Sequence, residues 1–201
     1  MDKDDRYMRA LAICTLGNKY LHLVKNIFEE NIKGGQTTSI VYNYVPTVQK
    51  MNEDTKWFFQ IIIIPTLFSF YHGIELTMKG LLTLLPEYNP KTTHSLTNLL
   101  QDFKNNYQMQ EEIINILEKY IVVEQMPPYL KNWFLKHKNN IDDYYDFLKY
   151  PFDAKFVKSY DYFDLKYDLD DENKGINLSE SILADVKSFL PKTVELYRSI
   201  K

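Results

Sequence analysis

The segment 70–82 places three ionisable side chains, His72, Glu75 and Lys79, inside a stretch that is otherwise mostly apolar. A helix repeats about every 3.6 residues, so side chains three and four positions apart lie on one face of it. Burying these groups without partners would cost several kcal/mol of folding free energy. We therefore expect a polar stripe whose members pair with one another or with groups on a neighbouring helix, inside a packed helical bundle.

A second helix is expected to begin near residue 95. Thr93 and Ser95 both precede an apolar run, and either can serve as the N-cap, because a hydroxyl there accepts hydrogen bonds from backbone N–H groups of the first turn. The apolar face of this helix consists of Leu96, Leu99, Leu100 and Phe103.

Together the two helices carry the pattern Tyr-His-x-Ile-Glu-Leu-x-x-Lys-x-Leu-Leu, then a loop with a proline, then His-Ser-Leu-x-x-Leu-Leu. This succession resembles the HEPN superfamily. The resemblance spans residues 58–103 and, more loosely, the helices up to Pro151. It implies an all-α, up-and-down helical bundle with long kinked helices, frequently a homodimer, and a family of RNA-cutting toxins, abortive-infection proteins and inactive binding modules.

Composition indicates one globular unit. With 201 residues, of which 45% are hydrophobic, the chain can bury one sizeable core, so a single domain over 1–201 is expected. Cys14 is the only cysteine and no basic-then-apolar leader precedes it, which favours a cytoplasmic protein. The net charge of −3 gives no global attraction to nucleic acid, although a local basic patch can still bind RNA.

The apolar stretch 57–85 is long enough to imitate a membrane span. It contains Pro65 and the polar stripe, and ionisable residues at bilayer depth are costly. We therefore expect this stretch to be buried in protein and not in a membrane.

Apolar residues recur at helical spacing through most of the chain. The first helix is expected from Asp4 or Asp5 to the Gly34–Gly35 pair. Its expected apolar face is Leu11, Leu16, Tyr20, Leu23, Val24, Ile27 and Phe28. Residues 37–50 indicate an irregular connector that wraps the bundle.

A long helix is expected from Asp54 to Leu85, kinked or divided at Pro65 because proline removes a backbone donor. Further helices are expected over 109–123, 129–138 and 141–149. The last helix should begin at a cap provided by Asn177 or Ser179 and bend at Pro191.

Before the last helix the pattern changes from helical to alternating. Phe163, Leu165, Tyr167 and Leu169 alternate with charged residues, which is the period of a half-buried strand. A small β-hairpin or loop insertion is therefore expected within 156–176.

The HEPN resemblance also implies a catalytic pattern, an Arg followed about four to six residues later by a His, which cuts RNA without a metal. Arg stabilises charge on the phosphate while His moves protons around attack by the ribose 2′-hydroxyl. No Arg here precedes a His at that spacing, and the nearest match is Lys131, Asn132 and His137. Lys131 supplies charge without the planar fork of Arg, so strong catalysis is not expected of this pair.

The same helix offers candidate RNA-binding groups. Lys136 and Lys138 could engage phosphates, and Trp133 or Tyr129 could stack on bases if their rings are exposed. The alternative interpretation is an exposed basic helix with Trp133 and Phe134 turned toward the core.

No metal or cofactor is expected. His72 and Glu75 form a His-x-x-Glu pair like those of di-iron bundles, but such sites need a second motif, and none occurs. The acidic run 168–172 lacks the glycine and the terminal Glu spacing of a calcium loop. His94, in a loop before a helix start, is expected to be a surface or capping residue.

Two functions stay open on these patterns. In the first, the chain is a divergent metal-independent endoribonuclease of a toxin–antitoxin or abortive-infection system, with Lys131 and His137 at its site. In the second, it is a catalytically inactive, dimeric HEPN-like module that binds a phage or antitoxin protein.

Overall fold

The computed structural model describes residues 2–35, 39–88, 94–137, 140–149, 162–167 and 174–200. All regular secondary structure in these ranges is helical, which confirms the all-α fold class. The helices are α1 (Lys3–Lys33), α2 (Val48–Thr55), α3 (Phe59–Thr83), α4 (Leu96–Asn106), α5 (Glu111–Ile121), a 3-10 turn η1 (Val123–Gln125), α6 (Pro128–His137), α7 (Ile141–Lys149), α8 (Phe163–Tyr167) and α9 (Lys174–Ser199).

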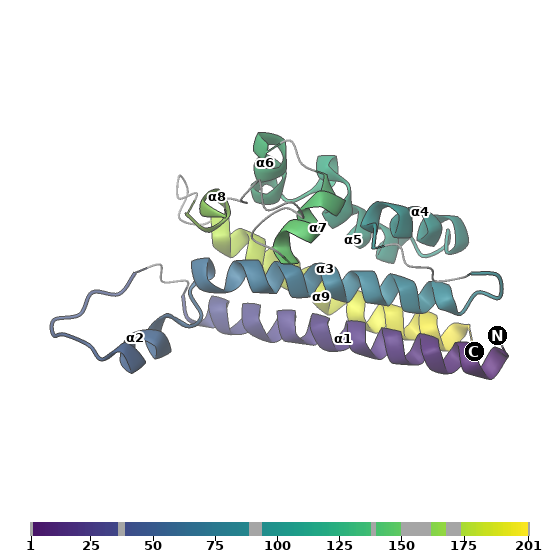
Figure 1. Cartoon of the computed structure of the whole chain (residues 1–201), viewed down its shortest axis with the longest axis horizontal. Coiled ribbons are helices and arrows are strands. Elements are labelled where there is room, and N and C mark those ends of the chain that lie inside the picture. Colours follow the sequence, from purple (N-terminus) through teal and green to yellow (C-terminus); the bar gives the residue numbers. More distant parts are fainter. Residues whose placement is uncertain are drawn as a thin grey trace.

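The helices form two layers (Figure 1). The long helices α1, α3 and α9 lie side by side in one layer, with α3 and α9 running antiparallel to α1. The shorter helices α4 to α8 form the second layer, and α3 contacts α4, α7 and α8 within it. Helix α3 therefore joins the two layers, together with α9, which contacts α5 and α6.

Helix α1 buries a row of residues that differs from the expected face. The buried row is Ala10, Cys14, Gly17, Leu21, Val24, Phe28 and Asn31. Leu11, Leu16 and Leu23, which were expected in the core, are exposed. The prediction was wrong at these positions because the side of α1 that meets α3 is selected by small size as much as by hydrophobicity.

The close approach between α1 and α3 requires glycine at the contact positions. A Cβ atom built at Gly17 of α1 would lie 2.9 Å from the carbonyl oxygen of Gly73 in α3. A Cβ atom at Gly80 of α3 would lie 2.3 Å from Cys14 Sγ and 2.9 Å from the Cys14 backbone nitrogen. Backbones at this separation leave no room for leucine side chains between them.

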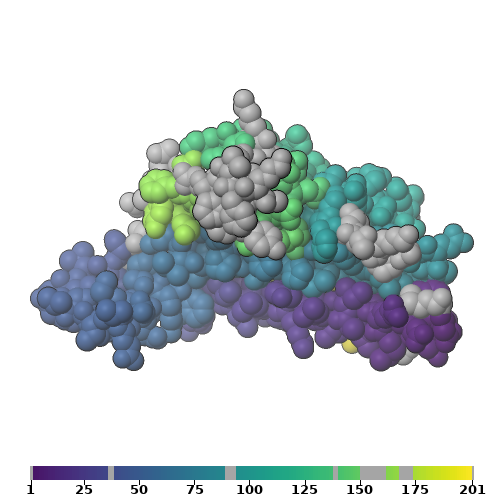
Figure 2. All heavy atoms as spheres, in the orientation of Figure 1, coloured from purple at the N-terminus to yellow at the C-terminus, as the bar shows by residue number. Residues whose placement is uncertain are grey.

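Residues 39–56 form an arm that projects from one end of the bundle (Figure 1), and the same end protrudes in the space-filling view of Figure 2. The arm contains α2, none of whose residues is buried. The expected irregular connector is confirmed over residues 39–47, but it projects from the bundle and does not wrap it, and α2 begins at Val48. The helix expected over 54–85 is interrupted between α2 and α3, where Asn31 donates to the Trp57 carbonyl at 2.6 Å. Helix α3 then continues through Pro65 and is not divided there.

Helical structure also occupies part of the expected hairpin. Residues 163–167 form α8, so the alternation there did not indicate a strand, and the remainder of 156–173 apart from Tyr162 lies outside the described residues. Helix α9 begins at Lys174, ahead of both expected caps, and it passes through Pro191. Ser179 is buried inside α9 and donates back to the Gly175 carbonyl at 2.9 Å, so it acts within the helix and not as its cap.

Within the described part of the chain, α3 is the one helix that is long and apolar enough to cross a membrane by length and composition. It is also the central helix of the bundle, and 67% of its most apolar window is buried inside the protein. Its apolar composition is explained by that burial.

Gly17→Ala is expected to lower the free energy of unfolding by about 1–3 kcal/mol, because the added methyl group overpacks the contact between α1 and α3. Urea unfolding at neutral pH measures the change. Gly34→Ala is the matched control, since a Cβ atom there would come no closer than 3.4 Å to its neighbours. Equal stabilities of the two variants would contradict the close helix contact.

Candidate functional site

A buried carboxylate gathers four polar side chains around it. Glu75 of α3 has an exposed fraction of 0%. Lys79 donates to its Oε1 atom at 2.6 Å, and Tyr145 of α7 donates to its Oε2 atom at 2.6 Å. The Nδ1 atoms of His94 and His72 lie 2.9 and 3.3 Å from Oε1 and Oε2, respectively. These five residues form the Glu75 cluster.

The carboxylate determines which ring nitrogens carry protons. A carboxylate only accepts hydrogen bonds, so His94 Nδ1 at 2.9 Å must donate to it. Lys79 Nζ lies 3.5 Å from the same nitrogen, too far to compete as its donor. The Tyr145 hydroxyl donates to Glu75 and therefore accepts from His72 Nδ1 at 2.6 Å. Both imidazoles, when neutral, keep Nε2 as an acceptor.

The cluster reaches the surface mainly through His94. Its side chain is 68% exposed, compared with 25% for His72 and 13% for Lys79. A carboxylate that holds Nδ1 of an exposed imidazole leaves Nε2 oriented to take up or release a proton. The geometry therefore supports general acid–base chemistry at this surface.

Hydrogen bonds lower the pKa of Glu75 by more than burial raises it. Burial alone would raise the pKa of this carboxyl group, because it penalises the charged form. Hydrogen bonds from His72, Lys79 and Tyr145, together with the Lys79 charge, hold the pKa of Glu75 well below its ordinary value of 4.5. Burial and the neighbouring carboxylate raise the pKa of Tyr145, which stays a hydrogen-bond donor.

The start of α4 positions His94. Ser95 is the N-cap, one of the two residues expected in that role. Asp142 of α7 accepts from Ser95 Oγ at 2.9 Å and from the Leu96 backbone N–H at 2.6 Å. A carboxylate is favoured at a helix N-terminus, where N–H groups lack partners and the helix dipole is positive. Asp142 therefore joins α7 to α4 and fixes His94 on one side and Tyr145 on the other.

Aromatic rings pack against the imidazole of His72. Phe68 stacks on His72 with ring centroids 5.6 Å apart, and Tyr20 of α1 meets the same ring edge-on at 4.7 Å. The Lys149 ammonium lies 3.8 Å from the centre of the Tyr145 ring. Such contacts restrict the His72 ring and the Tyr145 ring to the orientations that the carboxylate requires.

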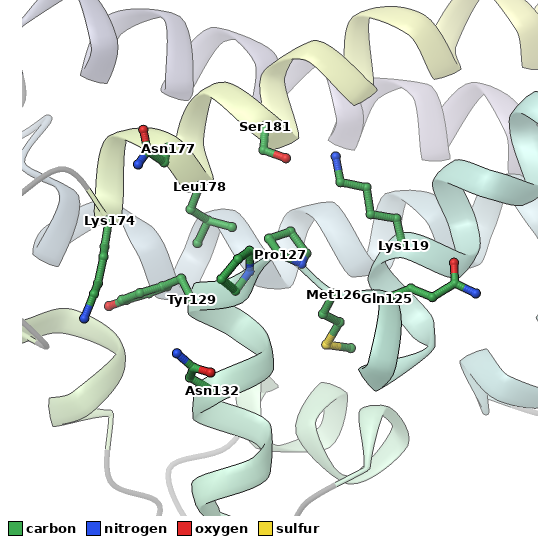
Figure 3. Close-up of a pocket in the computed structure, with 11 residues that line it drawn as sticks. Lys119, Gln125, Met126, Pro127, Tyr129, Asn132, Lys174, Asn177, Leu178 and Ser181 are labelled. Carbon is green, nitrogen blue, oxygen red and sulfur yellow. The ribbon is translucent and has the colours of Figure 1, made fainter. Parts of the chain in front are cut away.

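The structure does not bring Lys131 and His137 together. Lys131 Nζ donates to the Glu124 carbonyl at 3.0 Å, whereas His137 Nε2 lies 3.3 Å from Asp164 Oδ2 of α8. Residues six positions apart on a helix point about 120° away from each other, which explains the separation. Asn132 lines a pocket formed with other helices (Figure 3).

The expected RNA-binding side chains of α6 also have protein partners. Trp133 is buried, as the alternative interpretation of this helix expected, and it stacks on His137 with centroids 4.5 Å apart. Lys136 lies 2.5 Å from Asp164, whose pKa it lowers through a hydrogen bond. Lys138 lies outside the described residues.

The described ranges contain no group of three or more His, Cys, Asp or Glu side chains arranged to hold a metal ion. His72 and Glu75 contact each other and the cluster's donors. Cys14 packs against α3, and burial raises the pKa of its thiol to about 12, so it stays neutral.

The polar stripe of His72, Glu75 and Lys79 pairs internally, as its spacing had suggested, but sequence reasoning missed His94 and Tyr145. No local spacing relates positions 94 or 145 to position 75. The one available signal was a histidine immediately before a helix cap.

Comparison with known proteins identifies no relative: no protein-family model, curated protein or solved structure matches the chain.

Wild type is expected to lose more stability in acid than Glu75→Gln. Because the pKa of Glu75 is depressed below 4.5 on folding, its contribution is complete above that value and is lost as the pH falls toward the folded pKa. Between pH 5 and pH 3 the free energy of unfolding should fall by about 2 kcal/mol more in wild type than in Glu75→Gln. Urea unfolding at the two pH values provides the measurement.

Glu53→Gln is the control for this experiment, because it removes an exposed carboxylate from a surface ion pair with Lys56. It should retain the wild-type response to acid. Parallel losses of stability in wild type and Glu75→Gln would show that the buried carboxylate is not stabilised as described.

Proposed function

We propose that this protein cleaves RNA without a metal at the Glu75 cluster, as a HEPN-like cytoplasmic component of a stress or antiviral system. One observation carries the proposal: a single buried carboxylate holds the imidazoles of His72 and His94, one through Tyr145 and one directly. Transesterification of RNA requires one Nε2 atom that accepts a proton, a second that donates one, and a cation near the phosphate, and the two imidazoles and the Lys79 ammonium can supply these groups.

In the proposed reaction, His94 Nε2 accepts the proton of a ribose 2′-hydroxyl while the hydroxyl oxygen attacks phosphorus. The bond from phosphorus to the 5′-oxygen breaks, and protonated His72 gives its Nε2 proton to that oxygen. The products are a 2′,3′-cyclic phosphate and a 5′-hydroxyl. The reaction therefore requires that a turnover begins with His94 neutral and His72 protonated.

The charges of the cluster favour an anionic substrate. Glu75 is balanced by Lys79, and one protonated imidazole then leaves a net positive charge at the surface. Lys79 lies beside His94 and can stabilise charge that develops on the phosphate. Catalysis is thereby proposed at the Glu75 cluster and not at Lys131, Asn132 and His137 of α6.

His94→Ala is expected to reduce RNA cleavage at least a hundredfold, the usual contribution of a general acid or base. Its melting temperature should change little, because the side chain is mostly exposed. Purified protein is incubated with total RNA and with tRNA in the presence of EDTA, and cyclic-phosphate ends are quantified. His22→Ala is the matched control, because His22 is also an exposed histidine but lies on α1.

His137→Ala should retain cleavage if the Glu75 cluster is the site. Loss of cleavage in His137→Ala with full activity in His94→Ala would return catalysis to α6. Wild-type protein that produces no cyclic-phosphate ends would reject the nuclease proposal.

A second candidate function, a dimeric interaction module, is favoured by the arm. Val41 and Val45 are 95% and 94% exposed, and Val48 is 73% exposed. Isolated helices as short as α2 are marginal in water, and none of its residues is fully buried by the rest of the chain. An ordered projection with this composition is typical of a protein-binding element.

We propose that the arm binds a second copy of this chain. Helix α1 leaves Met8, Leu16 and Leu23 exposed on one outward side, so each chain carries both an apolar arm and an apolar helix face. Two-fold symmetry would allow two chains to cover both surfaces reciprocally. Sedimentation should then give twice 24.0 kDa, whereas a monomer that captures a phage or antitoxin protein would assign the arm to a different partner.

A further inference from the structure

A cavity of about 530 Å³ lies between η1, α6 and the start of α9, and it shares no residue with the Glu75 cluster. Its size is within the range of sites that bind small ligands. Figure 3 shows side chains from the end of α5, α6 and α9 converging on it. Its wall is built from apolar side chains, three amides and two lysines, and none of the lining residues is acidic.

The floor of the cavity is apolar. Met126, Pro127 and Leu178 are buried beneath it. The Tyr129 ring lies along one side, and its hydroxyl donates to the Leu165 carbonyl at 2.7 Å, which fixes the ring's orientation. A planar heterocycle could lie on this floor against the tyrosine.

The rim carries groups that can form hydrogen bonds with such a ring. Asn132 and Asn177 come from different helices, and Gln125 lies at the other end of the cavity (Figure 3). All three side chains are exposed to solvent. Each amide offers a donor and an acceptor together, which matches the adjacent donor and acceptor groups on the edge of a nucleobase.

The lysines lie at opposite ends of the cavity (Figure 3). Lys119 is held in place by Asp185 at 2.5 Å, a carboxylate that Tyr120 also contacts at 2.6 Å. Lys174 lies beyond Tyr129 at the first turn of α9. A ligand that spans the floor therefore has a lysine side chain at either end, and Asp185 balances the charge of Lys119.

We propose that this cavity binds a nucleoside phosphate unit, with the base on the floor, its edge on the amides and its phosphate toward a lysine. The unit could belong to a free nucleotide or to one position of an RNA strand, and both share the same chemistry. An acidic peptide would satisfy the lysines but would leave the apolar floor and the paired amide groups unused.

The test measures binding and not cleavage, so its outcome is independent of the proposed reaction. AMP is titrated calorimetrically, and a fluorescein-labelled dodecamer of 2′-O-methyl RNA, which has no 2′-hydroxyl to attack phosphorus, is followed by anisotropy. Asn132→Asp and Asn177→Asp each place a negative charge on the exposed rim. Asn26→Asp makes the same change on the exposed side of α1 and is the matched control.

Both rim variants should bind at least tenfold more weakly than wild type while keeping its melting temperature, and Asn26→Asp should bind like wild type. Binding of AMP without competition by the RNA identifies a free nucleotide as the source. Binding of the RNA that is lost in the rim variants identifies a strand. Failure of both probes to bind, equal affinities in all variants, or binding of a penta-glutamate peptide alone would overturn the proposal.

Discussion

The burial of one carboxylate, Glu75, constrains how three parts of the chain meet. An ionised group that is fully buried costs several kcal/mol unless charged and hydrogen-bonding partners surround it. Those partners come from α3 itself, from α7 through Tyr145, and from His94 just before α4. The second layer of helices therefore cannot shift along α3 without leaving the charge unsatisfied. The hydrogen bonds that stabilise the charge also orient the two imidazoles of the proposed site.

The contact between α1 and α3 determines which side of α3 is available for this cluster. Gly73, Thr77 and Gly80 face α1, where the two backbones approach too closely for larger side chains. The polar stripe lies on other sides of α3, toward the second layer and its surface. One helix thus uses small residues for packing and ionisable residues for chemistry, and 3.6 residues per turn keep the two sets apart.

The sequence allowed the fold class and most helices to be predicted, because their apolar periodicity is local. It also identified the polar stripe, since three members share one helix face. The exposed side of α1 was mispredicted, because hydrophobicity alone favours Leu16 over Gly17 as a core residue. A strand was wrongly predicted at 163–167, because so short a run of alternating apolar and charged residues fits one helical turn as well as a strand. His94 and Asp142 could not be placed, since their contacts depend on how α4 and α7 pack in three dimensions.

Glu75 orients both histidines so that each neutral ring carries its proton on Nδ1 and leaves Nε2 as an acceptor. Nitrogen-15 NMR of the imidazole rings at pH 8 reports which ring nitrogen carries the proton. We expect Nδ1-protonated rings for His72 and His94 in wild type, a shift toward Nε2 protonation in Glu75→Gln, and no change at the distant His22. Rings of His72 and His94 that are protonated on Nε2 in wild type, and unchanged in Glu75→Gln, would contradict the account.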